Sequence, residues 1–136
     1  MNAACRQIVF AVFALCFCAV FSPAQANAAR VEYTEAAFQS AVQSGKPVAL
    51  QFHASWCPTC KLQEKSLEAV LKDPAYADVT VYAADFDTAE ALLTKYKATT
   101  QGTIILFRDG KEVNRSVGET DEAKLREFLA PAAGKK

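Results

Sequence analysis

Apolar residues along the chain form short runs and regularly spaced pairs that predict alternating strands and helices. Unbroken apolar runs of strand length predict buried strands, and apolar residues every three or four positions predict helices with one buried face. The predicted strands cover residues 31–33, 47–52, 79–83, 103–107 and 112–117. The predicted helices begin after Thr34, at Pro58, after Thr88 and after Thr120. This order predicts an α/β fold with a central mixed β-sheet flanked by helices on both faces.

Local features within these elements can also be predicted. Thr88 and Thr120 are expected to cap the helices that follow them. Leu62 is expected on the buried side of its helix, together with Leu67. The dipeptide Asp109-Gly110 predicts a tight hairpin turn between two strands. Residues 131–136 have no periodic pattern and are expected to fray.

The first 28 residues have the pattern of a cleaved export signal. Arg6 precedes an unbroken apolar run over residues 8–21, and small residues follow it. At about 1.5 Å per residue the run reaches roughly 21 Å, whereas a bilayer core is roughly 30 Å thick. We therefore expect export to the periplasm with cleavage after Ala26 or Ala28, and no stable membrane span after processing.

The amino-acid composition of the chain is typical of one globular domain, which we place at residues 29–136. The 15 basic side chains are balanced by 15 acidic ones without a basic cluster, which excludes a nucleic-acid partner. Removing the signal also removes three of the five cysteines, Cys5, Cys16 and Cys18. Cys57 and Cys60 then remain alone in an oxidising compartment, where thiols pair.

The two remaining cysteines stand where a predicted strand gives way to a predicted helix, in the segment Cys57-Pro58-Thr59-Cys60. Unpaired N–H groups and the helix dipole at such an N-terminus favour the thiolate of the first cysteine. Cys60 is just under one helical turn away, within disulfide reach. We therefore expect Cys57 to attack a partner disulfide and Cys60 to resolve the mixed disulfide. No cofactor is needed, because the electrons reside on the cysteines.

The segment FHASWCPTCK, followed some forty residues later by TIILFRDGKEV, resembles the thioredoxin family. The resemblance implies the thioredoxin fold and a redox-active surface. That surface would comprise Trp56, Cys57, Pro58, Thr59 and Cys60. It also implies protein disulfide or dithiol substrates, and a membrane thiol-electron donor as a further partner.

The sequence departs from the family pattern at Gly102, at Gln51 together with Ala83, and in the dipeptide between the cysteines. Gly102 stands where the family usually has a cis-proline, so we expect a trans Gln101–Gly102 bond and a locally different loop. By resemblance, Gln101, Gly102 and Thr103 would form the loop on which substrate docks. Gln51 stands where the family has a buried acid, and Ala83 replaces the lysine often paired with that acid.

The missing acid leaves the proton of the resolving thiol without its usual acceptor, and His53 is the candidate replacement. Pro58-Thr59 between the cysteines predicts a site that is more oxidising than a typical thioredoxin. Two alternatives stay open at this point. One is a periplasmic metallochaperone that holds copper or zinc on Cys57, Cys60 and His53; the other is a non-redox binding module with an inert disulfide.

Overall fold

The structure is a computed structural model that describes residues 29–134. The expected export signal and its three cysteines lie outside the described residues, as do residues 135–136. The strands are β1 (Ala29–Glu32), β2 (Val48–His53), β3 (Thr80–Asp85), β4 (Thr103–Arg108) and β5 (Lys111–Val117). The helices are α1 (Glu35–Gln43), α2 (Pro58–Leu71), α3 (Glu90–Tyr96) and α4 (Glu122–Leu129), with short 3-10 turns at Pro74–Tyr76 and Ala130–Ala132. Every predicted strand and helix is therefore confirmed, and the predicted bounds differ from the observed ones by at most two residues.

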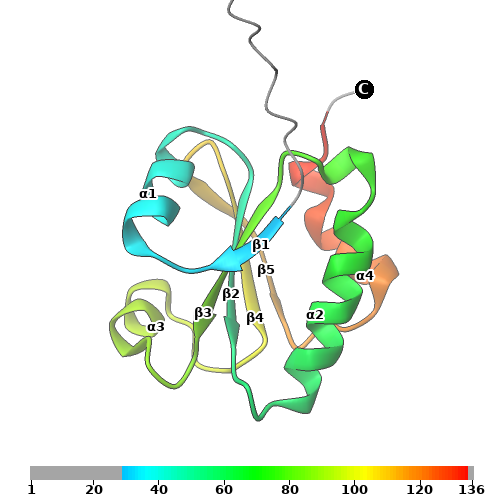
Figure 1. Ribbon diagram of the computed structural model, residues 1–136. Helices are drawn as coiled ribbons and strands as arrows, with labels where there is room; N and C mark the ends of the chain where they lie inside the picture. Colours follow the sequence, from blue (N-terminus) through cyan, green and yellow to red (C-terminus); the bar gives the residue numbers. More distant parts are fainter. Residues whose placement is uncertain (1–28, 135–136) are drawn as a thin grey trace, which may run out of the picture.

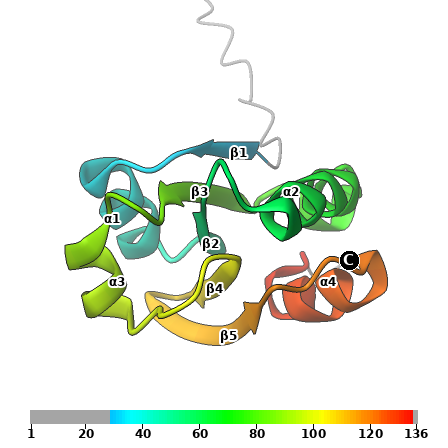
Figure 2. The same cartoon turned by 90° about the horizontal axis from the view of Figure 1, so that it is seen from below.

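The five strands form one mixed sheet in the order β1-β3-β2-β4-β5. β1, β3 and β2 run parallel, whereas β4 is antiparallel to both β2 and β5. Helices α1 and α3 lie on one face of the sheet, and α2 and α4 lie on the other (Figures 1 and 2). The β4–β5 hairpin turns at Asp109-Gly110, where both residues have positive φ (51° and 76°), as a type I′ hairpin turn requires.

Two apolar cores fill the spaces between the sheet and its helices, because side chains alternate between the two faces along each strand. The core beneath α2 and α4 contains Ala49, Leu67, Val70, Val81, Ile104, Leu106, Leu125 and Phe128. The core beneath α1 and α3 contains Phe38, Val48, Leu50, Phe52, Tyr82, Leu92, Ile105 and Phe107. On β2, Gln51 and His53 follow Ala49 at every second position, so both face α2.

Two of the predicted helix caps are wrong. Thr88 does not cap α3, whose N-cap residue is Ala89 and which has no side-chain cap; the backbone carbonyl of Asp85 instead accepts from the N–H groups of residues 88 and 89. In α4 the cap is Asp121 rather than Thr120, because its carboxylate accepts from the backbone N–H of Lys124 at 3.0 Å. Both threonines lie next to the true boundary, which the sequence does not resolve to one residue.

Asp121→Ala is expected to destabilise the protein by about 1 kcal/mol, because the first turn of α4 loses the acceptor for one of its free N–H groups. Thr120→Ala is the matched control and is expected to change stability by less than about 0.5 kcal/mol. Chemical denaturation of the two variants measures both values. Equal losses from the two substitutions would contradict this assignment of the cap.

Two further predictions are wrong. Leu62 is 59% exposed, and Gln63 is fully buried in its place. At about 100° per residue, Gln63 shares a helix face with Cys60 and Leu67, whereas Leu62 points to the opposite side. Residues 131–136 are expected to fray, but the first of them do not, because Ala132 ends a 3-10 turn and packs in the core beneath α4.

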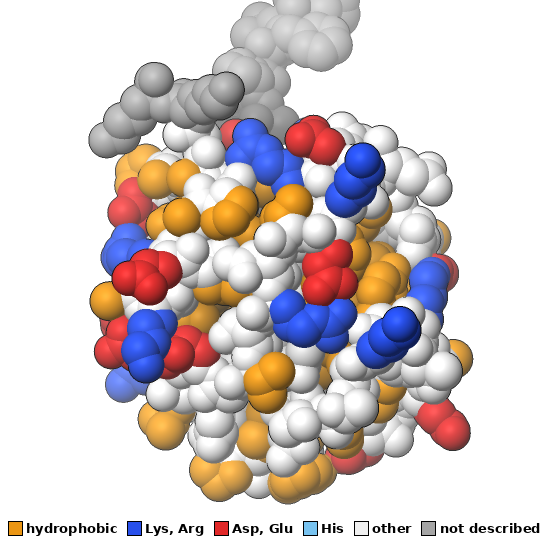
Figure 3. All heavy atoms as spheres, turned by 180° about the vertical axis from the view of Figure 1, so that it is seen from behind, with side chains coloured by type: hydrophobic (Ala, Val, Ile, Leu, Met, Phe, Trp, Pro, Cys, Tyr) orange, Lys and Arg blue, Asp and Glu red, His pale blue; other side chains and the backbone are white. Residues whose placement is uncertain are grey.

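The surface carries mixed charge. On the face shown in Figure 3, Lys and Arg side chains lie among Asp and Glu side chains, in line with the balanced composition. None of the helices between residues 29 and 134 is both long enough and apolar enough to cross a membrane.

Candidate redox site

The two cysteines lie at the start of α2, immediately after the carboxyl end of β2. Cys57 is the N-cap residue of α2, and its Sγ accepts a hydrogen bond from the backbone N–H of Cys60 at 3.2 Å. Pro58 occupies the first turn, where its missing N–H costs nothing. One of the free N–H groups of the helix is therefore directed at the sulfur of Cys57, as the sequence predicts.

The two sulfurs differ in their surroundings. Cys57 is 4% exposed and Cys60 is fully buried, and both are free thiols. Burial raises the pKa of the Cys60 thiol to about 11, and the neighbouring Cys57 side chain adds to this effect. Cys60 therefore stays protonated at neutral pH. The predicted redox-active surface is therefore wrong in degree at both cysteines, since only a small part of Cys57 reaches the surface and Cys60 does not reach it.

The residues next to Cys57 in the chain are exposed. Pro58 and Thr59 are exposed, and Trp56 is 57% exposed. The Trp56 indole Nε1–H donates to Asp87 Oδ2 at 2.7 Å, which anchors the ring to the segment after β3. This role of Asp87 could not be predicted from the sequence, because the two residues are 31 positions apart and no local pattern indicates the contact.

A polar layer lies beneath the cysteines, between the sheet and α2. Gln51 is fully buried; its Oε1 accepts from Arg30 Nε, and its Nε2 donates to Gln63 Oε1, both at 2.9 Å. Arg30 also contacts Glu64, its Nη2 lying 2.8 Å from Oε1, and His53 Nδ1 lies 3.4 Å from the same oxygen. The place of the family's buried acid is thus taken by a neutral amide within a hydrogen-bonded chain.

The predicted docking loop, residues 101–103, is hydrogen-bonded to this polar layer. Gln63 Nε2 and the backbone N–H of Gly118 both donate to the Gly102 carbonyl at 2.9 Å, and the Gly102 N–H donates to the Phe52 carbonyl at 2.7 Å. Thr103 is buried at the start of β4, and Gln101 is half-buried. No cis peptide bond occurs among the described residues, so the predicted trans bond before Gly102 is confirmed.

Sequence reasoning missed Arg30, Gln63 and Glu64 as members of this site. A signal for two of them existed, because Gln63 and Glu64 lie three and four residues after Cys60 and so share its side of the helix. Arg30 had no such signal, because it reaches the site from β1, which is 34 positions from Glu64.

The cysteines and His53 do not come together as a metal site. Between residues 29 and 134, no three His, Cys, Asp or Glu side chains are grouped so that they could hold a metal ion. His53 faces Glu64 instead, and its enclosed Nε2 has no hydrogen-bond partner. The geometry therefore gives no support to the metallochaperone alternative.

Comparisons with known proteins agree with this geometry. The sequence model of the family described as Thioredoxin matches residues 29–131. A thioredoxin of Mycobacterium bovis is 36% identical over 105 residues, covering 76% of this chain and 90% of that protein. A thioredoxin of Chlamydia trachomatis is 36% identical over 93 residues, covering 68% of this chain and 88% of that protein. The chain belongs to the thioredoxin family.

The structural comparison agrees. The crystal structure of Trxlp from Edwardsiella tarda matches with a TM-score of 0.71 at 42% identity, covering 75% of this chain and 98% of that one. The predicted thioredoxin fold is therefore confirmed. As a member of this family, the protein is a thiol-disulfide oxidoreductase.

Proposed function

We propose that the protein exchanges dithiol and disulfide with partner proteins through Cys57 and Cys60. The observation that carries this proposal is the difference between the two sulfurs: Cys57 caps the N-terminus of α2 and is 4% exposed, whereas Cys60 is fully buried and stays protonated. In the reduced protein the Cys57 thiolate attacks a partner disulfide, forms a mixed disulfide and releases the first partner sulfur. Cys60 then displaces the second partner sulfur and closes the Cys57–Cys60 disulfide.

Apolar surface near Cys57 supports a protein as the partner. Trp56 and Leu62 are each more than half exposed and lie within five residues of this cysteine. Aromatic and aliphatic side chains of this kind act as anchors in protein interfaces. The backbone at Gln101 and Thr103 would add an edge on which an extended partner segment docks. The test is capture of partner proteins by Cys60→Ser in the native host, because the mixed disulfide on Cys57 would then persist.

We also propose that the protein works in the periplasm and that a membrane thiol-electron donor keeps its cysteines reduced. The support is the apolar run over residues 8–21, which is followed by small residues and lies before the domain that begins at residue 29. Export leaves Cys57 and Cys60 as the two cysteines of the mature chain, so no other thiol in this chain competes for either sulfur.

Export predicts a defined N-terminus for the mature protein. When the full chain is expressed in a Gram-negative host, the periplasmic form is expected to begin at Asn27 or Ala29, after cleavage behind Ala26 or Ala28. Intact mass measurement of the periplasmic fraction checks this. Replacing Ala26 and Ala28 together by bulky residues is expected to block cleavage. An uncleaved chain that stays in the cytoplasm would contradict export.

A further inference from the structure

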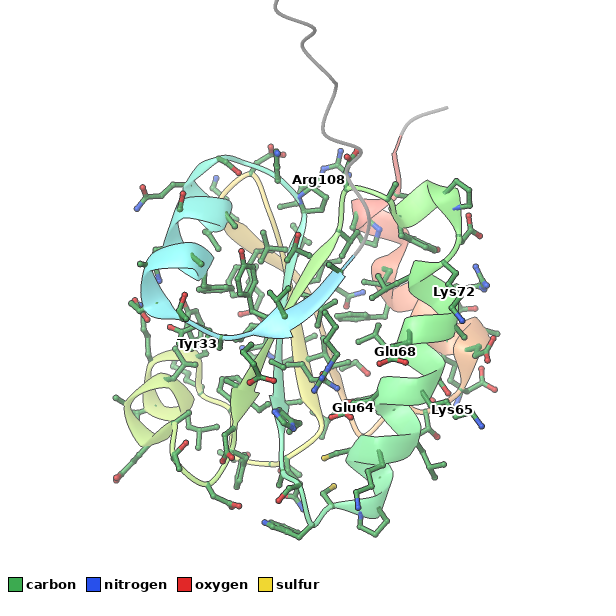
Figure 4. The ribbon with its side chains drawn as sticks, in the orientation of Figure 1. Tyr33, Glu64, Lys65, Glu68, Lys72 and Arg108 are labelled. Atoms are coloured by element: carbon green, nitrogen blue, oxygen red, sulfur yellow. The ribbon has the colours of Figure 1, made fainter. Side chains whose placement is uncertain are left out.

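Three side chains that carry charge or can titrate meet beside the cysteines, and they come from three different elements. Arg30 extends from β1, His53 from the end of β2 and Glu64 from α2. Glu64 Oε1 lies 2.8 Å from Arg30 Nη2 and 3.4 Å from His53 Nδ1. All three are between 18% and 26% exposed. Figure 4 shows Glu64 pointing from α2 toward the sheet, whereas Lys65, the next residue, points away from it.

Glu64 is also placed to act on Cys60. It lies four residues after Cys60 on α2, so the two side chains lie on the same side of the helix, one turn apart. The charge of Glu64 contributes to the raised pKa of the Cys60 thiol. The residues that replace the family's buried pair, Gln51 and Ala83, have no side-chain group that could take up this proton.

We propose that Glu64 accepts the proton of the Cys60 thiol when the mixed disulfide is resolved, and that Arg30 and His53 position its carboxylate. This inference rests on the proposed function. In the step, the S–H bond of Cys60 breaks and the proton passes to Glu64. The Cys60 sulfur uses the freed electron pair to bond to Cys57 Sγ, and the bond from Cys57 to the partner sulfur breaks. The partner leaves as a thiolate, and Glu64 returns its proton to solvent.

The step is balanced without any further reactant. The cysteine pair loses two electrons as its disulfide forms, and the partner gains them as its disulfide becomes two thiols. The groups that face Glu64 are Arg30 from β1, His53 from β2 and Cys60 on its own helix; Lys61 and Glu68 lie one turn away on α2.

The two roles that Glu64 could have predict opposite effects when its charge is removed. If it acted only as a negative charge, Glu64→Gln would lower the pKa of Cys60, increase its thiolate fraction and speed resolution. If it accepts the proton, Glu64→Gln slows resolution even though the pKa of Cys60 falls. The rate and the pKa must therefore be measured in the same variant.

The experiment follows the purified, reduced protein as it reacts with an aromatic disulfide whose released thiol is coloured. Attack by Cys57 releases one equivalent and resolution by Cys60 releases the second, so stopped-flow absorbance separates the two steps. Glu64→Gln is expected to slow the second step by about 10²-fold and to leave the first unchanged. Glu68→Gln, which removes the same charge one turn further along α2, is the matched control and is expected to change neither step.

A second measurement does not depend on exchange. In a Cys57→Ser background, ultraviolet titration of the Cys60 thiolate is expected to show a lower pKa when Glu64→Gln is added. Glu64→Asp keeps the acid on a shorter side chain, so it is expected to resolve the mixed disulfide faster than Glu64→Gln but more slowly than the unchanged protein. If Glu64→Gln folds poorly, the resolution rate of Glu64→Asp tests the inference in its place.

Two outcomes would overturn the inference. One is a second step that is as fast in Glu64→Gln as in the unchanged protein, or faster. The other is a second step that Glu68→Gln slows as much as Glu64→Gln does. If the unchanged protein released no coloured thiol at all, the proposed function itself would fail, and the inference with it. That result differs from a normal first step followed by a second step that is insensitive to Glu64.

Discussion

Replacing Cys57 by serine is expected to lower the rate of protein disulfide exchange by about 10³-fold or more, close to the uncatalysed rate. A serine hydroxyl cannot form a disulfide and is not ionised at neutral pH, so the attacking group is lost. Reduction of a disulfide-bonded test protein such as insulin, with a chemical reductant to recycle the variant, measures the effect. The serine is nearly isosteric in its buried place, so the thermal unfolding of the variant should remain close to that of the unchanged protein.

Cys60→Ser is the matched control for this prediction. It keeps the attacking sulfur and removes the resolving one, so it is expected to accumulate as a mixed disulfide with the test protein. Two results would argue against the proposed chemistry. One is exchange that survives Cys57→Ser, and the other is partner capture that survives it, as a non-redox binding module would show.

Restoring the family's proline at residue 102 is expected to destabilise this protein by about 3 kcal/mol or more. Gly102 has a φ of +79°, whereas proline holds φ near −65°. Proline would also remove the N–H that donates to the Phe52 carbonyl at 2.7 Å. Urea unfolding of Gly102→Pro measures the loss.

Gly102→Ala separates the two causes of this loss. Alanine keeps the N–H, and its Cβ would lie 3.4 Å from the backbone of Gly118, which is ordinary contact. The remaining cost is the left-handed backbone, about 1–2 kcal/mol. A proline variant as stable as the unchanged protein would mean that the loop does not depend on this glycine.

The sequence predicts the fold well because local pattern determines most of it. Apolar runs such as 103–107 identify buried strands, and Asp109-Gly110 identifies a hairpin, without knowledge of distant residues. The errors occur where neighbouring residues compete for one role, as Thr120 and Asp121 do for the cap of α4. The prediction for Leu62 is wrong because the helical period, and not hydrophobicity, decides which of two neighbouring residues is buried, and it puts Gln63 on the buried side.

The part of the site that local sequence determines could also be predicted. Cys57, Cys60 and the exposed Trp56 follow from a short motif, and the trans bond before Gly102 follows from the absence of proline. The polar layer does not follow, because Arg30 meets Gln51 and Glu64 only after β1 has paired with β3 across the sheet. Tertiary contacts of this kind leave no local trace in the sequence.

Mass spectrometry can identify which of the two sulfurs forms the first bond with a partner. The reduced protein is mixed with a disulfide-bonded peptide, quenched with acid after successive short intervals, and digested for mass spectrometry. We expect the peptide first on Cys57 alone, and we expect the Cys57–Cys60 disulfide to replace this adduct. A first adduct on Cys60, or equal labelling of both cysteines, would contradict this expectation.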